Sequence, residues 1–238
     1  MNESSTSTSS DPLGFLGGAF DPVHTGHLRG ALAARESLGL ECVDLIPAAQ
    51  SPLKSASTVD AGHRLAMLQL AVANVSGLGV DARELDRPGP SYTIDTLAEL
   101  RRDWGQGRSL FWLIGSDNLC TLPKWARWQD LLDFAHLAVL DRPGASPPPP
   151  VVAEWLVHHE ADVAAATSRP AGKVVRLQQP LLDIASSAIR AMIAEDRDPR
   201  FLMPDVVMEY IEAHDLFARS SAWTLKSLKQ HPQTAQRC

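Results

Sequence analysis

The stretch from Gly17 to His27, GGAFDPVHTGH, is the feature that most constrains the fold of this chain. It sets two glycines and two histidines between an apolar run and a helical pattern. The run before it, Leu13–Gly17, is short, apolar and bounded by breakers, which is typical of a buried strand. After it, Leu28, Ala31, Leu32 and Leu38 recur at helical spacing. The sequence therefore predicts a strand, a tight turn and a helix; residues 17–27 are called the phosphate turn below.

The phosphate turn has the properties of an anion site. Gly17 and Gly18 let the backbone turn sharply and approach a ligand without a Cβ in the way. The helix that follows offers free N–H groups and its positive dipole end to an anion. His24 and His27, at i and i+3, are expected on one side of the first helical turn.

Two other interpretations of this stretch are disfavoured. A zinc site would need a third and a fourth ligand at metal-site spacing, which the sequence lacks, and the histidine pair lacks the i, i+4 geometry of a metalloprotease helix. No metal ligands are therefore predicted from the protein. A hydride-transferring dinucleotide enzyme is disfavoured because the G-x-G-x-x-G fingerprint is absent.

Apolar runs alternate with helical patterns along the chain, which predicts an α/β fold: a Rossmann-like, doubly wound parallel sheet of about five to six strands with helices on both faces, in a single domain. In such folds ligands bind outside the carboxyl ends of the strands, where the phosphate turn is expected. We expect strands near Leu13–Gly17, Cys42–Ile46, Leu78–Asp81, Leu110–Ile114, His136–Leu140 and Val174–Leu177. We expect helices near Gly26–Ser37, Ala61–Asn74, Ile94–Asp103, Trp128–Phe134, Val151–His159, Ser187–Glu195 and Asp205–Ala213.

Length and composition favour one globular domain. With 238 residues and a 45% hydrophobic share, the chain can bury one sizeable core, which we place in residues 13–218. The Ser/Thr-rich residues 1–12 are expected to form a disordered extension, and the polar residues 219–238 a poorly ordered tail. The segment 142–150, which ends in four prolines, is expected to be a loop or polyproline II.

Charge and cysteine usage narrow the function further. The net charge is −6 and the Lys and Arg residues are scattered, so no nucleic-acid footprint is present. No apolar stretch approaches the roughly 20 residues that span a bilayer, which argues against a membrane partner. The cysteines, Cys42, Cys120 and Cys238, lie far apart and suit a reducing compartment. We expect a cytoplasmic protein with small-molecule partners, and the sequence leaves a homo-oligomer open.

A second candidate anion site lies near the end of the predicted domain. Residues 184–190, IASSAIR, place small hydroxyl residues just ahead of a helical pattern that carries Arg190 on its first turn. A serine N-cap beside a surface arginine would explain the residue types. A second phosphate cradle, made of hydroxyls, backbone N–H groups and a guanidinium, would explain them equally.

These segments carry a family resemblance. The phosphate turn resembles the G-G-x-F-D-P-x-H-x-G-H signature of the nucleotidylyltransferase superfamily, and specifically of nicotinic acid mononucleotide adenylyltransferases. Residues 184–190 are similar to the I-S-S-T-x-I-R motif of the same superfamily, whose hydroxyls and arginine grip the triphosphate. Ala185 stands where that motif has its first serine, and Ser187 stands where it has threonine.

Segments in the middle of the chain also resemble the nicotinate family. Residues 87–97, RPGPSYTIDTL, resemble its R-x-G-x-S-Y-T-x-D-T-L segment and are called the acceptor segment below. Residues 111–118 and the Leu-Pro-Lys-Trp of residues 122–125 match further family segments. The resemblance implies that Trp125 stacks on the nicotinate ring. It also implies that backbone N–H groups near Thr93 and Ala126 bind the nicotinate carboxylate. By their residue types alone, Trp125 could equally be a core aromatic and the Asp117 carboxylate a helix N-cap.

One loop departs from the family pattern, and two arginines elsewhere in the chain match it. Residues 47–54 occupy the place of a family loop that ends in P-P-H-K, but Leu53 replaces its histidine and Ser51 its first proline. The resemblance implies that Lys54 contacts a phosphate, although by its residue type a lysine in a loop is usually solvated. Arg64 and Arg142 also match family segments, although their residue type alone predicts surface arginines.

The resemblance implies an enzyme that joins the adenylyl group of ATP to nicotinate mononucleotide, giving nicotinate adenine dinucleotide and pyrophosphate, with Mg²⁺ accompanying ATP. The implied catalytic residues are His24, His27 and Arg190. The implied ATP- and phosphate-binding residues are Gly17, Gly18, Ala19, Phe20, Lys54, Ser186, Ser187 and Ile189. The implied mononucleotide-binding residues are Thr93, Asp117, Trp125, Ala126 and Arg142. The alternatives are a transferase acting on nicotinamide mononucleotide or phosphopantetheine, and a non-catalytic nucleotide-binding protein on the same fold.

Overall fold

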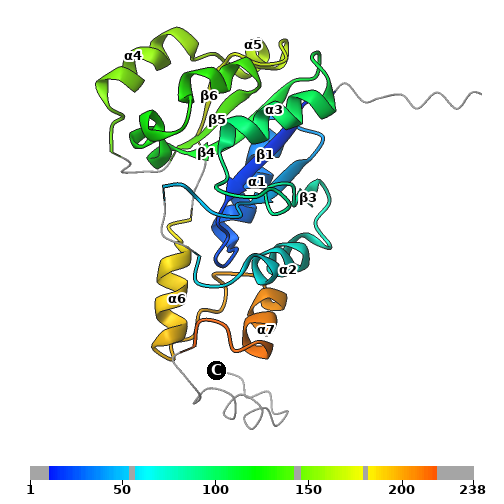
Figure 1. The fold of residues 1–238 in the computed structure, drawn as a ribbon, viewed down its shortest axis with the longest axis vertical. Helices are drawn as coiled ribbons and strands as arrows, with labels where there is room; N and C mark the ends of the chain where they lie inside the picture. Colours follow the sequence, from blue (N-terminus) through cyan, green and yellow to red (C-terminus); the bar gives the residue numbers. More distant parts are fainter. Residues whose placement is uncertain (1–10, 54–56, 142–145, 179–181, 219–238) are drawn as a thin grey trace, which may run out of the picture.

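The computed structural model describes residues 11–53, 57–141, 146–178 and 182–218. Its strands form one parallel six-stranded sheet in the order β3-β2-β1-β4-β5-β6 (Figure 1). The strands are β1 (Leu13–Gly18), β2 (Val43–Pro47), β3 (Leu78–Val80), β4 (Leu110–Gly115), β5 (His136–Asp141) and β6 (Val174–Gln178). The α-helices are α1 (Thr25–Leu38), α2 (Ala61–Val72), α3 (Thr93–Trp104), α4 (Pro150–His159), α5 (Val163–Thr167), α6 (Ser186–Ala194) and α7 (Asp205–Ala213). The predicted doubly wound fold is confirmed.

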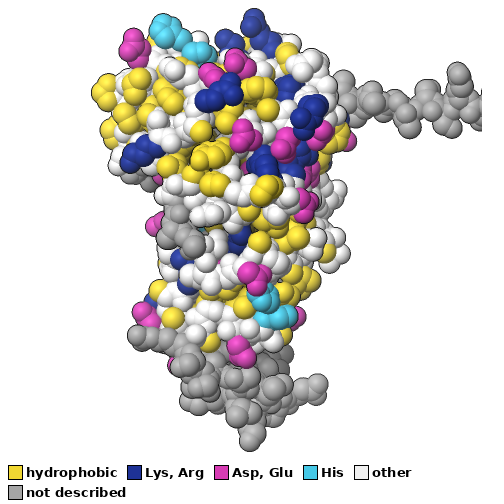
Figure 2. All heavy atoms as spheres, in the orientation of Figure 1, with side chains coloured by type: hydrophobic (Ala, Val, Ile, Leu, Met, Phe, Trp, Pro, Cys, Tyr) yellow, Lys and Arg dark blue, Asp and Glu magenta, His cyan; other side chains and the backbone are white. Residues whose placement is uncertain are grey.

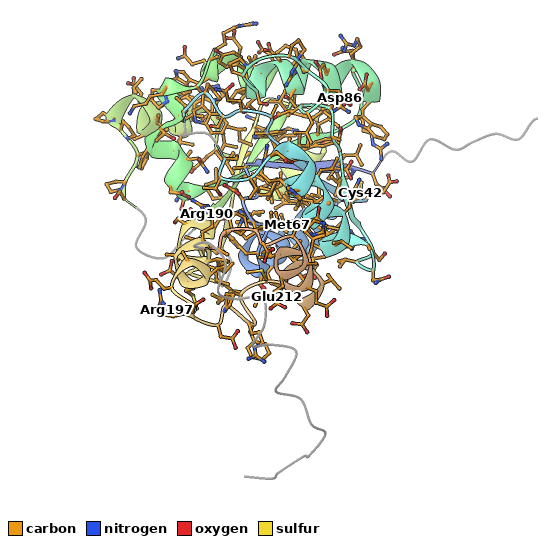
Figure 3. All side chains as sticks on the ribbon, turned by 60° about the horizontal axis from the view of Figure 1, so that its bottom comes forward. Cys42, Met67, Asp86, Arg190, Arg197 and Glu212 are labelled. Atoms are coloured by element: carbon orange, nitrogen blue, oxygen red, sulfur yellow. The ribbon has the colours of Figure 1, made fainter. Side chains whose placement is uncertain are left out.

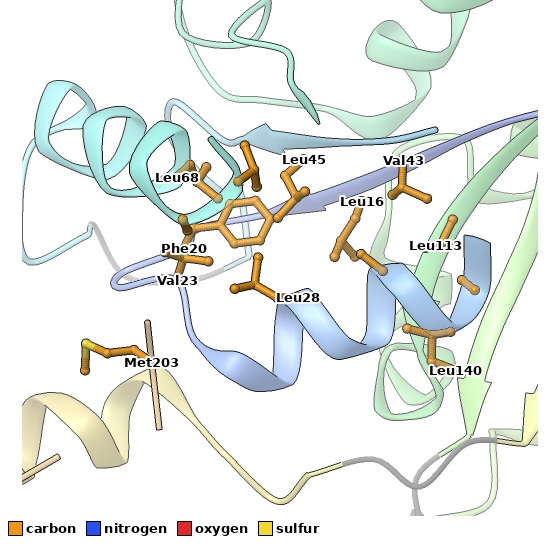
Figure 4. Close-up of a cluster of buried hydrophobic side chains, with 14 of the residues drawn as sticks. Leu16, Phe20, Val23, Leu28, Val43, Leu45, Leu68, Leu113, Leu140 and Met203 are labelled. Carbon is orange, nitrogen blue, oxygen red and sulfur yellow. The ribbon is translucent and has the colours of Figure 1, made fainter. Parts of the chain in front are cut away.

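The sheet separates two hydrophobic cores. Neighbouring residues of a strand point to opposite faces, so Phe15 contributes to one core and Leu16 to the other. On the Leu16 face, α1, α2, α5, α6 and α7 cover the sheet, and Figure 4 shows part of this core. On the Phe15 face, α3 and α4 cover it. The central strands are therefore buried on both faces, as parallel strands usually are.

Helix α1 is fixed at both ends. His24 is its N-cap, and Gly39 ends it in the left-handed conformation at φ 62°, which glycine adopts without a steric penalty. Its buried side consists of Leu28, Gly30, Ala31, Ala34 and Leu38. Three of the four predicted positions are therefore buried, whereas Leu32 is only partly buried. This stripe anchors the helix on the sheet and aims its N-terminus at the end of β1.

Helices α6 and α7 lie next to each other below the sheet in Figure 1. The link between them meets the start of α1, because the Thr25 backbone N–H donates to the Leu202 carbonyl at 2.8 Å. The start of α6 meets the same region, where the Ser186 hydroxyl donates to the Pro22 carbonyl at 2.9 Å. Segments from both ends of the domain are thus joined at the phosphate turn.

Some short elements differ from the prediction. The helix expected at Trp128–Phe134 is a 3-10 helix, η3 (Trp128–Asp133), and two more 3-10 helices follow β4: η1 (Ser116–Cys120) and η2 (Leu122–Lys124). Helix α5 was not expected; its Asp162 cap accepts the Ala165 N–H at 2.7 Å. Pro150, placed in the loop by sequence, is the first residue of α4, where a missing N–H costs nothing.

Charged side chains of both signs lie on the face of the molecule that Figure 2 shows. In Figure 2 the basic and acidic side chains are interspersed over the face that is visible. Within the described ranges, no helix combines the length and apolar character that crossing a membrane requires. The expected terminal extensions fall largely outside the described residues, as do Lys54 and Arg142.

Candidate functional site

The glycines of the phosphate turn are needed for close packing within the protein. A Cβ on Gly17 would run into the indole of Trp112 on the neighbouring strand β4. A Cβ on Gly18 would lie 3.0 Å from the ring of Phe20. The left-handed residue of the turn is Phe20 itself, at φ 49°. The sharp turn that was expected at the glycines is therefore made two residues after Gly18, at a non-glycine residue that pays a steric cost.

Phe20 holds this conformation because its side chain is locked in the core. Figure 4 shows its ring beside Leu45 and Leu68, and 1% of the residue is exposed. The ring edge also meets the His27 imidazole, with 5.0 Å between centroids. Because the Phe20 ring is buried, only its backbone can contact a ligand. The ring itself packs against the His27 imidazole.

The structure brings the two histidines of the phosphate turn together, as the sequence predicted. The His24 and His27 rings stack with their centroids 3.7 Å apart. The His24 backbone N–H donates to His27 Nδ1 at 3.3 Å, so a neutral His27 carries its proton on Nε2. Gly26 makes room for the pair, because a Cβ there would lie 3.1 Å from the His24 ring. The H-x-G-H spacing thus has a local steric reason.

Helix α6 forms a second wall beside this turn. Arg190 donates from Nη1 to the Asp21 carbonyl at 2.6 Å and lies 3.8 Å from Asp21 Oδ2. Figure 3 shows Arg190 on the part of α6 nearest the main body. Ser186 and Ser187 occupy the first turn of α6, whose N–H groups have no helical carbonyl before them. The Ile189 side chain is in the core, and its N–H is bonded to the Ala185 carbonyl.

Asp21 connects the phosphate turn to the loop after β2. Its Oδ2 accepts hydrogen bonds from the backbone N–H and the hydroxyl of Thr58, at 2.7 and 2.8 Å. The residue is 5% exposed. Because Arg190 and Thr58 both bind Asp21, this aspartate joins α6, the phosphate turn and the β2–α2 loop.

Arg64 of α2 is a site residue whose position the sequence mispredicted. It was expected on the surface, but 1% of it is exposed. Its guanidinium donates to the Ala19 carbonyl at 2.8 Å and to the Ala49 carbonyl at 3.3 Å. Burial lowers the pKa of Arg64, which the nearby Asp21 charge partly offsets. The hydrogen-bond partners of Arg64 are backbone carbonyls distant in the sequence. No sequence motif identifies such partners.

The acceptor segment is tied down by hydrogen bonds within the protein. Ser91 accepts the Ala49 N–H at 3.0 Å on its hydroxyl and donates its own N–H to the Gln50 carbonyl at 2.8 Å. Thr96 donates to the Glu84 carboxylate at 2.6 Å, and burial raises the pKa of Glu84. Thr93 is the first residue of α3, so its N–H lies among the free N–H groups of a helix N-terminus.

The remaining predicted residues follow β4. Gly115 makes room for Asp117, since a Cβ would lie 2.5 Å from its carboxylate oxygen. Trp125 is the C-cap of η2, and its N–H donates to the Leu122 carbonyl at 2.9 Å. Ala126 follows Trp125 in the chain. The Trp125 ring is half-buried against the Phe15-side core, across the sheet from Phe20. The predicted residues therefore gather at two places, on either side of the strand ends.

The chain matches known proteins along most of its length. The cytidylyltransferase-like family matches residues 15–192. A Pseudomonas putida (strain W619) protein named "Probable nicotinate-nucleotide adenylyltransferase" is 46% identical over 206 residues, covering 86% of this chain and 94% of that protein. A Pseudomonas entomophila protein of the same name is 44% identical over 210 residues, covering 88% and 96%.

Solved structures share the fold. The Plasmodium falciparum nicotinic acid mononucleotide adenylyltransferase complexed with NaAD superposes with a TM-score of 0.67 at 16% identity, covering 87% of this chain and 97% of that one. The same enzyme complexed with APC gives 0.66 with the same coverage. At this identity the likeness concerns the arrangement of strands and helices.

Proposed function

This chain belongs to the cytidylyltransferase-like family, and from that membership and its relatives we infer that it is a nicotinate-nucleotide adenylyltransferase, which joins the adenylyl group of ATP to nicotinate mononucleotide. The products are nicotinate adenine dinucleotide and pyrophosphate. The observation that carries this inference in the structure is the meeting of two helix N-termini, a histidine pair and Arg190 around one turn. This is a site for a polyanion with several negative charges.

The reaction needs alignment more than a protein nucleophile. An oxygen of the mononucleotide 5′-phosphate attacks the α-phosphorus of ATP, a new P–O bond forms, and the bond to the bridging oxygen breaks as pyrophosphate leaves with the electron pair. We propose that His24, His27 and Arg190 stabilise the charge that moves onto the leaving group. Ser186, Ser187 and the backbone of residues 17–20 hold the triphosphate, which fixes the line of attack.

Trp125 and the N-terminus of α3 are proposed to bind the acceptor. An electron-poor pyridinium ring gains about 0.5–2 kcal/mol over an indole face. Free N–H groups at Thr93 and near Ala126 suit the nicotinate carboxylate, which the amide mononucleotide lacks. Asp117 is proposed to line the same pocket, and Arg142 and Lys54 stay proposals from the family resemblance.

Mg²⁺ is proposed to enter with ATP. Among the described residues, no three His, Cys, Asp or Glu side chains are grouped to hold a metal. Mg²⁺ that accompanies a nucleotide is usually held through phosphate oxygens and water, with few ligands from the protein. When bound, the ion neutralises phosphate charge, while the protein residues above orient the reacting groups.

The proposed partners are thus ATP and nicotinate mononucleotide, and the proposed compartment is the cytoplasm. The two described cysteines, Cys42 and Cys120, are free thiols, which agrees with a reducing compartment.

A pyrophosphate-release assay tests the function. ATP and Mg²⁺ are combined with nicotinate mononucleotide, nicotinamide mononucleotide or phosphopantetheine in parallel. We expect the highest kcat/KM with nicotinate mononucleotide, and mass spectrometry should identify nicotinate adenine dinucleotide. A preference for either other acceptor would replace the substrate assignment, and no release with any acceptor would favour a non-catalytic nucleotide-binding protein.

A further inference from the structure

Residues 47–50, called the strap below, lie between the phosphate turn and the acceptor segment and are bonded to both. On one side, the Ala48 N–H donates to the Gly18 carbonyl at 2.9 Å. On the other side, the Ser91 N–H donates to the Gln50 carbonyl at 2.8 Å. The strap is the continuation of β2, which neighbours β1 in the sheet.

Both polar groups of one strap residue, Ala49, are used for this connection. Its carbonyl accepts from Arg64 at 3.3 Å, and the same guanidinium donates to the Ala19 carbonyl at 2.8 Å. Its N–H donates to the Ser91 hydroxyl at 3.0 Å. A continuous chain of hydrogen bonds therefore runs from Ala19 through Arg64 and Ala49 to Ser91.

Two side chains of this hydrogen-bond chain are buried. Arg64 is 1% exposed and Ser91 is 9% exposed. The buried Glu84 carboxylate, next to Ser91, accepts a hydrogen bond from the Thr96 hydroxyl of α3 at 2.6 Å. Hydrogen bonds between buried groups resist displacement, because a shift that breaks them leaves a desolvated group unpaired.

We propose that Arg64 is a positioning residue of the transfer reaction: through Ala49 it holds the phosphate turn and the acceptor segment at a fixed separation. This inference rests on the proposed function, in which the two segments carry the two substrates. Arg64 is buried against backbone carbonyls and acts through them. Since transfer requires the acceptor oxygen in line with the α-phosphorus, an error of about 1 Å between the segments costs on the order of a hundredfold in rate.

The proposal predicts that loss of Arg64 lowers kcat and leaves the binding of each substrate nearly unchanged. Arg64→Met should lower kcat by about thirtyfold or more, while the Kd of each substrate measured alone by calorimetry changes by less than about threefold. Arg64→Lys keeps the charge and one donor, so its kcat should fall between that of Arg64→Met and that of the wild type. An Arg64→Met protein with normal kcat, or with its whole defect in the ATP Kd, would overturn the proposal.

Arg101 supplies the matched control for the loss of a buried arginine. It is 3% exposed and binds the carbonyls of Phe134, Gly105, Arg108 and Pro170, at the other edge of the sheet. Arg101→Met should lower the Tm at least as much as Arg64→Met, yet leave kcat within about twofold well below the Tm. Equal kcat losses in both variants would show that Arg64 contributes only to the stability of the fold.

Ser91→Ala keeps the proposal testable if Arg64→Met does not fold. It removes the other anchor of Ala49 and should lower kcat by about tenfold with a smaller change in each Kd. Hydrogen exchange without substrates should show faster exchange at the Ala49 amide in Ser91→Ala and in Arg64→Lys. Unchanged exchange in both variants would contradict the hydrogen-bond chain.

The wild-type assay separates this inference from the proposed function. If the wild type releases no pyrophosphate with nicotinate mononucleotide, the proposed function is wrong. If the wild type is active and the Arg64 and Ser91 variants are unaffected, only the positioning role of Arg64 is wrong.

Discussion

At the first turn of α1, the Nδ1 atom of His27 is occupied, because it accepts the His24 backbone N–H at 3.3 Å. The useful donor of a neutral His27 is therefore Nε2–H. The His24 ring stacks on it, with 3.7 Å between the two centroids. This geometry allows the two nitrogens of His27 to be tested separately.

His27→Asn and His27→Gln form a matched pair. The Asn amide can replace Nδ1 but does not reach the place of Nε2, whereas the longer Gln amide does. His27→Asn should lower kcat by about a hundredfold, as loss of one transition-state donor usually does, and His27→Gln should lower it less. Steady-state kinetics at saturating ATP measure both, and near-normal kcat in His27→Asn would remove this residue from the mechanism.

Gly26 allows a test of histidine placement without changing a histidine. A Cβ at Gly26 would lie 3.1 Å from the His24 ring, so Gly26→Ala should shift that imidazole and lower kcat by about tenfold. Its stability should stay the same or rise, because alanine favours a helix by about 1 kcal/mol over glycine. Thermal unfolding and kinetics together show whether the two effects separate.

Gly62→Ala is the control for this change. Gly62 is also the second residue of its helix, α2, and its Cβ would lie 3.2 Å from the side chain of the N-cap Asp60. It should leave kcat unchanged. A loss of kcat in both alanine variants would point to a general effect on helix starts.

At the scale of single residues, the sequence predicted the placement of side chains that belong to a local motif. It missed the placement of side chains whose hydrogen-bond partners are distant in the sequence. The pairing of His24 and His27 follows from their spacing, since i and i+3 share a helix face. The burial of Arg64 does not follow, because its acceptors are the carbonyls of Ala19 and Ala49. A backbone carbonyl has no residue-type signature, so only the folded arrangement identifies it.

At the scale of elements, long periodic segments were predicted well and compact ones poorly. The strands and longer helices agree with prediction to within a few residues, because burial on one or both faces determines their pattern. The 3-10 helices after β4 are too short to show a period, and η3 starts after Arg127 in a left-handed conformation at φ 51°. Such turns are fixed by the packing around them.

The 3-10 element η2 carries the proposed acceptor aromatic at its end, so Trp125→Ala tests that element. It should raise the KM for nicotinate mononucleotide by about tenfold and leave the ATP KM nearly unchanged, because only the mononucleotide ring is proposed to stack there. If only the ATP affinity suffers, the stacking assignment is wrong. Trp104→Ala, at the end of α3 under the Arg108 guanidinium, controls for loss of an exposed indole.

At the scale of the whole molecule, a buried histidine links stability to pH. His136 of β5 is fully buried; its Nδ1 accepts the Lys173 N–H at 3.1 Å and its Nε2–H donates to the Arg169 carbonyl at 2.9 Å. Burial lowers the pKa of His136 in the folded protein. A proton therefore binds better to the unfolded chain, whose histidine titrates near about 6.5.

Stability from His136 should thus be complete above that pH and decline as the pH falls below it. Compared with His136→Gln, the wild type should lose its advantage in unfolding free energy between about pH 7 and pH 5, by at most about 1.4 kcal/mol per pH unit. Urea unfolding across this range measures the difference. An advantage that does not change with pH would contradict the linkage, and the exposed His158→Gln controls for loss of a histidine elsewhere.

The contact between Arg190 and Asp21 joins residues 169 positions apart. Since domains form as the chain leaves the ribosome from its N-terminus, the phosphate turn emerges long before its second wall has been translated. A nascent or prematurely terminated chain therefore holds the histidine pair without α6. The proposed catalytic set, which includes Arg190, is therefore complete only after α6 has been translated.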